Sequence, residues 1–294
     1  PHASSSAASD VYKRQIMDTR DIRTIQPHEV LDKINLKVGE LDFLDGSPPC
    51  ASFSTAGKRE KDWGKVKSYS GKQQRTDDLF YEYIRMVKEI KPKIFVAENV
   101  KGLIMGKAKG YFNKFLAEFN KLNYNVKASL LDASYLEVPQ MRKRVFIIGV
   151  RKDLNRQPVF PKKHKQMIVK DVYEKNYPVE KEAKHIPKSY MKYLVNLKQG
   201  EQPNGSFFSL KRNHLYRPSY TILATYGAGA CVMHPYENRH MSIAELKDIC
   251  SFPQSFKLIG KYTDQAERLG RSVPPNMMKN IIKTLRKQVF NENT

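Results

Sequence analysis

The chain has 294 residues, of which 40% are hydrophobic, and a formal net charge of +22. This length is enough for one large domain and a smaller one, and no apolar run approaches the roughly 18 residues of a membrane span. Its three cysteines are too few for a disulfide framework, which predicts a protein of the reducing cytoplasm. The positive charge favours a polyanionic partner such as nucleic acid, although solvated lysines alone would give the same composition.

Residues 1–16 differ in composition from the rest of the chain. They are rich in Ser and Ala and lack the apolar centre of a signal peptide, so we expect a foreign or disordered tail. Residues 17–151 then alternate strand and helix patterns, which predicts a mainly parallel α/β sheet with helices on both faces. The predicted strands are residues 41–45, 93–97, 126–131 and 145–150, and the predicted helices are residues 78–90 and 111–122.

Residues 152–240 lose this alternation and are interrupted by prolines. Between residues 151 and 215 there are 15 Lys and Arg side chains against 6 Asp and Glu, which is typical of a small basic module or an insertion over a groove. A solvated, lysine-rich surface is the alternative. Residues 241–294 return to helical patterns, and Pro274 and Pro275 introduce a last helix at residues 276–289.

Three clusters of polar residues lie next to predicted strands, and open α/β sheets bind ligands at the carboxyl ends of their strands. In the first, Pro48 and Pro49 fix the backbone ahead of Cys50 and hold the thiol on a non-helical turn. A cysteine placed there is either a nucleophile or an inert buried residue. In the second, Glu98 follows an apolar strand, where its carboxylate needs a partner or a chemical role.

The third cluster is Gln140, Arg142 and Arg144. If the strand begins at Gln140, the three side chains alternate onto one face and present an amide beside two guanidinium groups. Such a face suits a phosphate or the edge of a base, and an ordinary basic edge strand is the alternative.

In this order the clusters resemble the signature blocks of the DNA (cytosine-5) methyltransferases: the Pro-Cys loop, the Glu-Asn-Val strand end and the Gln-x-Arg-x-Arg block. Other blocks resemble the same family, namely Asp21-Ile22-Arg23, Asp78-Leu79-Phe80, Arg239 to Glu245 with Phe252-Pro253, and Gly270 to Pro275. The resemblance implies a Rossmann-like α/β methyltransferase sheet at residues 17–151, a small target-recognition domain at residues 152–240, and a C-terminal segment, 241–294, that returns to the catalytic domain.

The resemblance also implies a role for each residue at the reaction centre. Cys50 would add to C6 of a cytosine flipped out of double-stranded DNA. Glu98 would hold the N3 and amino edge of the ring, and Arg144 would bind O2 with support from Arg142. After C5 has taken a methyl group from S-adenosylmethionine, loss of the C5 proton would release the thiolate. No metal is implied.

Two further sets of residues follow from the resemblance. The residues expected to bind S-adenosylmethionine are Asp21, Ile22, Pro49, Leu79, Ser272 and Val273, and those expected to contact DNA are Gln140 and Arg239. The protein is expected to be a monomer without membrane contact, and Cys231 and Cys250 are expected to be structural.

The sequence departs from the family before Asp21. Family members begin with a strand and a Gly-rich turn for the methionine part of the donor, followed about twenty residues later by an acidic residue for the ribose. The sequence shows neither, so we expect an amino-terminally truncated chain with a partial sheet and impaired donor binding. Smaller departures are Ala51 in place of Gln and Arg271 in place of Asn.

Two other functions stay open. The chain could be a non-catalytic DNA-binding remnant or one half of a split methyltransferase, and it would then bind DNA without transferring methyl groups. It could also belong to the tRNA-methylating branch of the family, but the Cys-Phe-Thr element expected in that branch is missing from the sequence.

Overall fold

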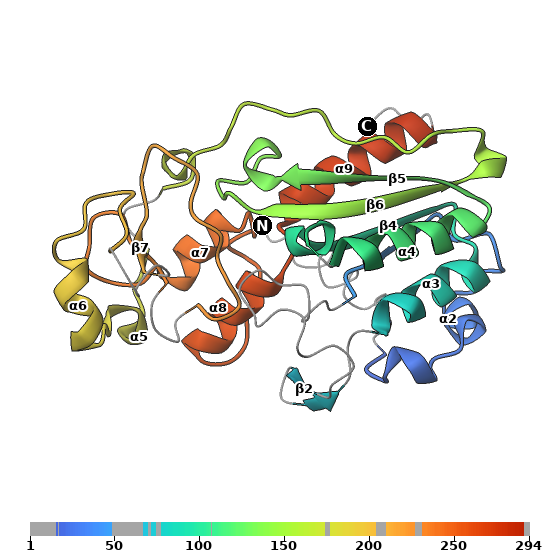
Figure 1. Ribbon diagram of the computed structural model, residues 1–294. Coiled ribbons are helices and arrows are strands. Elements are labelled where there is room, and N and C mark those ends of the chain that lie inside the picture. The colour runs from blue at the N-terminus through green and yellow to red at the C-terminus, as the bar shows by residue number, and fades with distance from the viewer. Residues whose placement is uncertain are drawn as a thin grey trace, which may run out of the picture. The chain divides into compact units, whose positions relative to one another are not determined.

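The structure is a computed structural model that describes residues 16, 18–48, 67–69, 72–74, 78–106, 108–173, 177–203, 210–226 and 231–290 (Figure 1). The chain folds into two compact units, each built from two separate segments. Unit 1 consists of residues 1–128 and 145–158, and unit 2 consists of residues 129–144 and 159–294.

A four-stranded sheet runs in the order β1 (Phe43–Gly46), β4 (Ile94–Val100), β6 (Lys143–Arg151), β5 (Tyr124–Asp132). β1 and β4 are parallel. β5 and β6 are antiparallel, because Ala133 donates to the Arg142 carbonyl at one end of the pair and Lys152 donates to the Asn123 carbonyl at the other. All four predicted strands are confirmed. β6 is also antiparallel to β4, because Arg151 at its end donates to the Lys93 carbonyl at the start of β4. β1, β4 and β5 therefore share one direction, and within this sheet β6 runs the opposite way. Two further strands, β2 (Lys67–Tyr69) and β3 (Lys72–Gln74), form an antiparallel pair.

The core of unit 1 lies between one face of the sheet and two helices (Figure 1). The helices of this unit are α2 (Pro27–Lys33), α3 (Leu79–Ile90) and α4 (Ala108–Lys121), with the 3-10 turns η1 (Ile22–Thr24), η3 (Lys101–Ile104) and η5 (Lys152–Leu154). The apolar stripe of α3 contacts α4 through Phe80, whose ring stacks on Phe115 at 4.0 Å between centroids. Phe95 of β4 stacks on Phe119 of α4 at 4.4 Å. Both predicted helices are therefore present, and their aromatic residues hold them against the sheet.

Unit 2 has a hydrophobic core of its own. Its elements are η4 (Ala133–Tyr135), η6 (Val169–Asp171), α5 (Lys181–Lys184), α6 (Lys188–Leu194), β7 (Lys211–Arg212), β8 (Val232–Met233), α7 (Ile243–Ile249), α8 (Tyr262–Arg271) and α9 (Pro275–Val289). Buried residues of the lysine-rich stretch, such as Leu194 and Ile222, share this core with Leu246 of α7 and Leu269 of α8. The expected recognition region thus folds around an apolar centre together with the C-terminal segment. The predicted last helix is confirmed as α9.

Candidate active site

The carboxyl ends of β1 and β4 bring two of the predicted clusters to one edge of the sheet. The strands run parallel with Gly46 opposite Ala97, so the chain that leads to Cys50 leaves the sheet beside Glu98. Glu98 is partly exposed within β4. Cys50 itself lies outside the described residues.

Asn99 joins these two chain segments. It is 4% exposed, and its Nδ2 donates a hydrogen bond of 3.3 Å to the carbonyl of Pro48. Its Oδ1 accepts a hydrogen bond of 2.8 Å from the Val100 amide, which fixes the orientation of the side chain. The start of the Pro-Cys loop is therefore anchored to the strand that carries Glu98, one residue before Pro49, which also lies outside the described residues.

Gly46 is required where β1 ends. A Cβ atom on this residue would lie 2.4 Å from Cε2 of Tyr83, closer than atoms can approach. Tyr83 is buried, and its hydroxyl lies 3.0 Å from the carbonyl of Leu44 and 2.9 Å from that of Val96, so it donates between the two strands. Burial raises the pKa of Tyr83 well above its usual value, which keeps this donor protonated. One tyrosine from α3 thus fixes the spacing of β1 and β4.

Two of the predicted donor-binding segments meet in unit 1 through Arg23. Asp21 caps η1 by accepting a hydrogen bond of 3.0 Å from the Arg23 amide. The Arg23 guanidinium forms ion pairs with Asp21 at 2.8 Å and with Asp78, the residue before Leu79. The hydrogen bond from the Arg23 amide is the main cause that lowers the pKa of Asp21, so this carboxylate is charged. The Asp21 side chain is 44% exposed and Leu79 is partly buried, which fits an acceptor and an apolar wall for the adenosine end of a donor. Ile22 lies within the same turn.

The structure corrects the prediction for the Gln-x-Arg-x-Arg block. β6 begins at Lys143, so Gln140 and Arg142 precede the strand and do not alternate along one of its faces. Gln140 is fully buried and Arg142 is 2% exposed, and both bind main-chain groups of Ile222. Only Arg144 is partly exposed. Gln140 therefore has internal partners, and the DNA contact expected of it stays a prediction.

Ser272 and Val273, expected in the donor pocket, follow helix α8 in unit 2. Ser272 caps this helix, with its amide donating to the Arg268 carbonyl at 3.1 Å and its hydroxyl to the Leu269 carbonyl at 2.8 Å. Both Ser272 and Val273 are partly exposed, as residues that touch a ligand must be.

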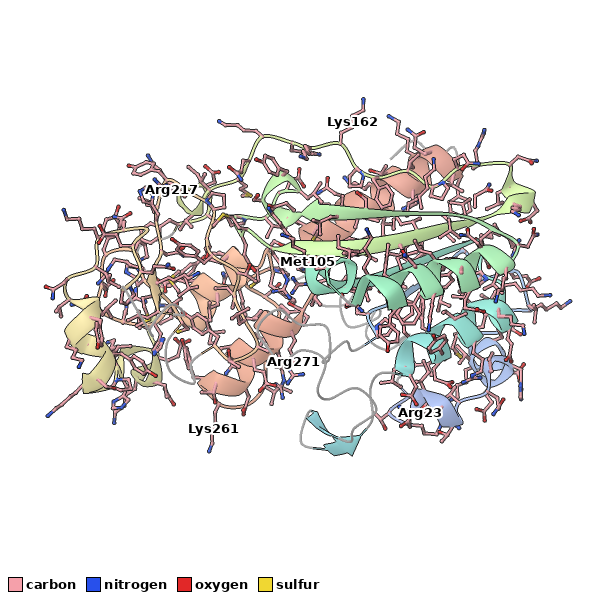
Figure 2. All side chains as sticks on the ribbon, in the orientation of Figure 1. Arg23, Met105, Lys162, Arg217, Lys261 and Arg271 are labelled. Carbon is pink, nitrogen blue, oxygen red and sulfur yellow. The ribbon has the colours of Figure 1, made fainter. Side chains whose placement is uncertain are left out.

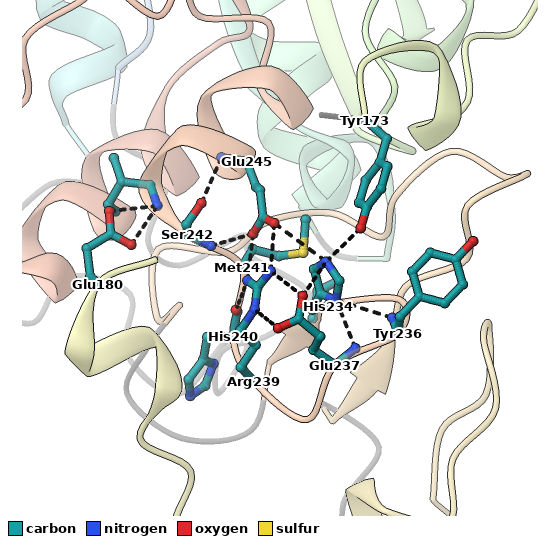
Figure 3. A network of polar contacts seen from close by, with 12 residues as sticks. Tyr173, Glu180, His234, Tyr236, Glu237, Arg239, His240, Met241, Ser242 and Glu245 are labelled. Carbon is teal, nitrogen blue, oxygen red and sulfur yellow. Dashed lines mark hydrogen bonds and ion pairs between the residues drawn. The ribbon is translucent and has the colours of Figure 1, made fainter. Parts of the chain in front are cut away.

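Arg239 lies inside a network of charged groups in unit 2 (Figure 3). It is 6% exposed, and its guanidinium donates to both carboxylate oxygens of Glu245 at 2.8 and 2.9 Å. It also pairs with Glu237 at 3.0 Å. Burial opposes its charge, but the hydrogen bonds to Glu245 and Glu237 raise the pKa of Arg239 above its usual range. This guanidinium is bonded inside the protein, and the DNA contact expected from the sequence stays a prediction.

Glu245 connects Arg239 to the start of helix α7. Its carboxylate accepts from the Ser242 amide at 2.6 Å, while the Ser242 hydroxyl accepts from the Glu245 amide at 3.2 Å, a reciprocal cap for the start of the helix. His234 lies 3.5 Å from the same carboxylate, and its Nδ1 accepts from the amides of Tyr236 and Glu237 (Figure 3). Burial lowers the pKa of His234 to about 4, so the ring is neutral at pH 7.

Other features bear on what the site can bind. No sequence pattern marks the roles of Tyr83 and Asn99, because their partners are main-chain carbonyls on other segments.

Cys231 and Cys250 are buried, and burial raises the pKa of Cys250 to about 11, as suits a structural thiol. Among the described residues, no group of three or more His, Cys, Asp or Glu side chains could hold a metal ion. In the same residues no helix is long and apolar enough to cross a membrane.

Comparison with known proteins gives consistent matches over the whole chain. The family model of C-5 cytosine-specific DNA methylases matches residues 4–287. The type II methyltransferase M1.HphI of Haemophilus parahaemolyticus is 28% identical over 99% of this chain and 80% of its own length. The type II methyltransferase M.FnuDI of Fusobacterium nucleatum is 30% identical over 91% of this chain and 80% of its own length.

Solved structures share the fold. One, described as a DNA modification methyltransferase encoded within an E. coli prophage, superimposes with a TM-score of 0.71 at 20% identity and covers 96% of this chain and 88% of its own. A DNMT2 from Spodoptera frugiperda superimposes with a TM-score of 0.63 at 17% identity and covers 99% of this chain and 90% of its own. At these identities the likeness concerns the fold alone.

Proposed function

The chain belongs to the family of C-5 cytosine-specific DNA methylases, enzymes that use S-adenosylmethionine, and we propose that it methylates C5 of a flipped cytosine through a covalent adduct with Cys50. The observation that carries this proposal is the shared edge of β1 and β4. The parallel register and the hydrogen bond from Asn99 to Pro48 support a loop that starts beside Glu98 and reaches Cys50 two residues later.

Each protein group in this proposal has one chemical task. The thiolate of Cys50 adds to C6 of the cytosine, forming a carbon–sulfur bond and moving the electron pair of the 5,6 double bond to C5. Glu98 binds the N3 and amino edge of the ring and stabilises its N3-protonated form, so that negative charge does not accumulate on the ring, and Arg144 binds O2. S-adenosylmethionine supplies the methyl group. A base or water removes the C5 proton, and the electrons left at C5 expel the Cys50 thiolate and restore the double bond.

For the donor, the proposal assigns an acceptor and apolar contacts. Asp21 and Leu79 are suited to the adenosine end because one is a charged, exposed acceptor and the other is an apolar side chain, and Arg23 holds the two segments together. Ile22 and Pro49 of unit 1, and Ser272 and Val273 of unit 2, are proposed as further donor-binding residues. The protein would act as a monomer in the cytoplasm, where its DNA lies.

For the DNA, unit 2 offers a surface on which cations lie next to aromatic rings. Nζ of Lys170 is 4.9 Å from the ring centre of Tyr216, which is 59% exposed, and Nζ of Lys211 is 4.8 Å from the ring centre of Tyr220. Arg217 and Lys162 are exposed in the same unit (Figure 2). Lysines and arginines neutralise the phosphates of DNA. We therefore assign this surface of the recognition region to contacts with duplex DNA.

The test is transfer of labelled methyl groups from S-adenosylmethionine to duplex DNA and to tRNA. The proposal predicts transfer to DNA by the wild-type chain at saturating S-adenosylmethionine and none by Cys50→Ser, with unchanged DNA affinity. Cys231→Ser is the matched control, because it makes the same one-atom change at a buried thiol outside the proposed site, and it should retain activity.

Each alternative gives a different result in that test. Binding of DNA without transfer would identify a non-catalytic remnant or one half of a split enzyme. Transfer to tRNA and not to DNA would identify the tRNA-methylating branch. Normal transfer by Cys50→Ser would show that the nucleophile has been misassigned.

A further inference from the structure

Arg142 connects two segments that are far apart in the sequence. Its Nη1 donates to the carbonyl of Ile222 at 3.0 Å, and its Nη2 donates to the carbonyl of Gly270 at 2.9 Å. With 2% of its surface exposed, the guanidinium lies within the core of unit 2. Burying a guanidinium is costly unless its N–H groups form hydrogen bonds. The two carbonyls therefore stabilise the buried side chain, and the side chain in turn fixes their positions.

Gln140 binds the other main-chain group of the same residue, Ile222. Its Oε1 accepts a hydrogen bond of 3.2 Å from the Ile222 amide, and its Nε2 donates to the carbonyl of Ile249 at 3.2 Å. The amide and the carbonyl of Ile222 are therefore each bonded to a side chain of the Gln-x-Arg-x-Arg block. Backbone bonds extend the contact, since Met141 donates to the Ser219 carbonyl at 2.8 Å.

We call the contacts of Gln140 and Arg142 with residues 219–224 and Gly270 the clamp. Gly270 lies in helix α8. A Cβ atom on Gly270 would lie 2.2 Å from the carbonyl oxygen of Leu223, so residues 222–224 pass directly over the helix at a point where only glycine leaves room. Arg144 follows Arg142 by two residues, and Ser272 follows Gly270 by two. One buried guanidinium thus links the arm that carries the proposed O2 ligand with the segment proposed to line the donor pocket.

We propose that Gln140 and Arg142 are positioning residues that hold residues 219–224 against α8 and thereby set the places of Arg144 and Ser272. They do not bind base or phosphate themselves. This inference rests on the proposed function, because it concerns the alignment of substrate and donor for methyl transfer. A shift of about 1 Å in such an alignment lowers a rate by about 100-fold.

The experiment compares Arg142→Met with Lys143→Met in the full chain. The lysine is the matched control, because it is adjacent, exposed and equally charged but outside the clamp. Arg142→Met should lower kcat by about 100-fold with little change in KM for DNA, since phosphate contacts elsewhere are kept. It should also weaken S-adenosylmethionine binding and accelerate hydrogen exchange at the Ile222 amide. Lys143→Met should leave kcat and this exchange unchanged.

Gly270→Ala displaces residues 222–224 from the opposite side and should give the same pattern, which decides the matter if Arg142→Met does not fold. Unchanged exchange at Ile222 in both variants would show that no clamp exists. A raised KM for DNA at constant kcat would instead show that Arg142 contacts the substrate. If the wild-type chain transfers no methyl groups to DNA, the proposed function fails, while the exchange measurement still tests the clamp.

Discussion

Replacing Arg239 by Met separates the structural role of this residue from the DNA contact that its sequence block suggests. The substitution removes both hydrogen bonds to Glu245, which is only 6% exposed, and leaves its carboxylate charged inside unit 2. Breaking a buried pair by removing one partner costs about 3–5 kcal/mol. Glu237 adds little, because an exposed partner is screened by water. At ~2–4 °C per kcal/mol, we expect the melting temperature to fall by ~6–20 °C.

The assay is thermal or urea unfolding of the wild type, Arg239→Met, Glu245→Gln and the double variant. The double variant has no uncompensated carboxylate and keeps an acceptor for the Ser242 amide, so it should recover about 2 kcal/mol relative to the sum of the single changes. DNA affinity, measured below the melting temperature, should change little in Arg239→Met. A variant as stable as the wild type but tenfold weaker in DNA binding would refute the internal role and restore the contact expected from the sequence.

Three further predictions concern pH, the Pro-Cys loop and the DNA surface. Burial lowers the pKa of His234 and of His240 from 6.5 to about 4. As the pH falls, these histidines are therefore protonated in the unfolded chain before they are protonated in the folded one. The free energy of unfolding should fall between pH 6.5 and pH 4, by roughly 3 kcal/mol for each ring. A His240→Leu variant should show a shallower loss in urea titrations, and exposed His28→Gln should match the wild type. Gly46→Ala should lower the free energy of unfolding by about 1–3 kcal/mol and lower kcat, because the new Cβ atom would clash with Tyr83. Gly110→Ala is the control and should do neither, because Gly110 has open space around it. Equal melting temperatures of the two variants would contradict this prediction. The double variant Lys170→Ala, Tyr216→Ala should weaken DNA binding. The slope of log affinity against log salt concentration should become shallower by about 0.9 for each phosphate that the variant no longer neutralises. Lys114→Ala, beside Tyr111 in unit 1, is the control, and an identical effect there would mean that binding is unspecific.

The elements that local pattern controls could be predicted from the sequence. Helix α3 follows from apolar residues repeated at helical spacing, and β4 follows from a continuous apolar run between a proline and a charged residue. The placement of Glu98 at the carboxyl end of a strand also followed from that run. The direction of pairing could not be predicted, because the residues of a strand do not specify its neighbours. β6 runs antiparallel to β5.

The interior partners of polar residues could not be predicted. Gln140 and Arg142 bind groups about 80 to 130 residues away, and nothing near them in the sequence marks those partners. Alternation in the sequence favours a strand that begins at Gln140, whereas β6 begins at Lys143. A charged block with a resemblance to a functional signature is easily taken for a ligand-binding face. Whether such a block binds a ligand or stabilises the interior depends on its burial, and burial is a property of the tertiary structure.

The central claim is the covalent use of Cys50, and trapping the adduct tests it most directly. The chain would be incubated with S-adenosylmethionine and duplex DNA in which 5-fluorocytosine replaces cytosine, so that no knowledge of the recognised sequence is needed. Fluorine at C5 cannot leave as a proton, so elimination stops and the enzyme should stay joined to DNA. The account predicts a denaturation-resistant complex whose peptide mass places the nucleotide on Cys50, and none with Cys50→Ser. An adduct on another residue, or methyl transfer to ordinary DNA without any trapped complex, would contradict it.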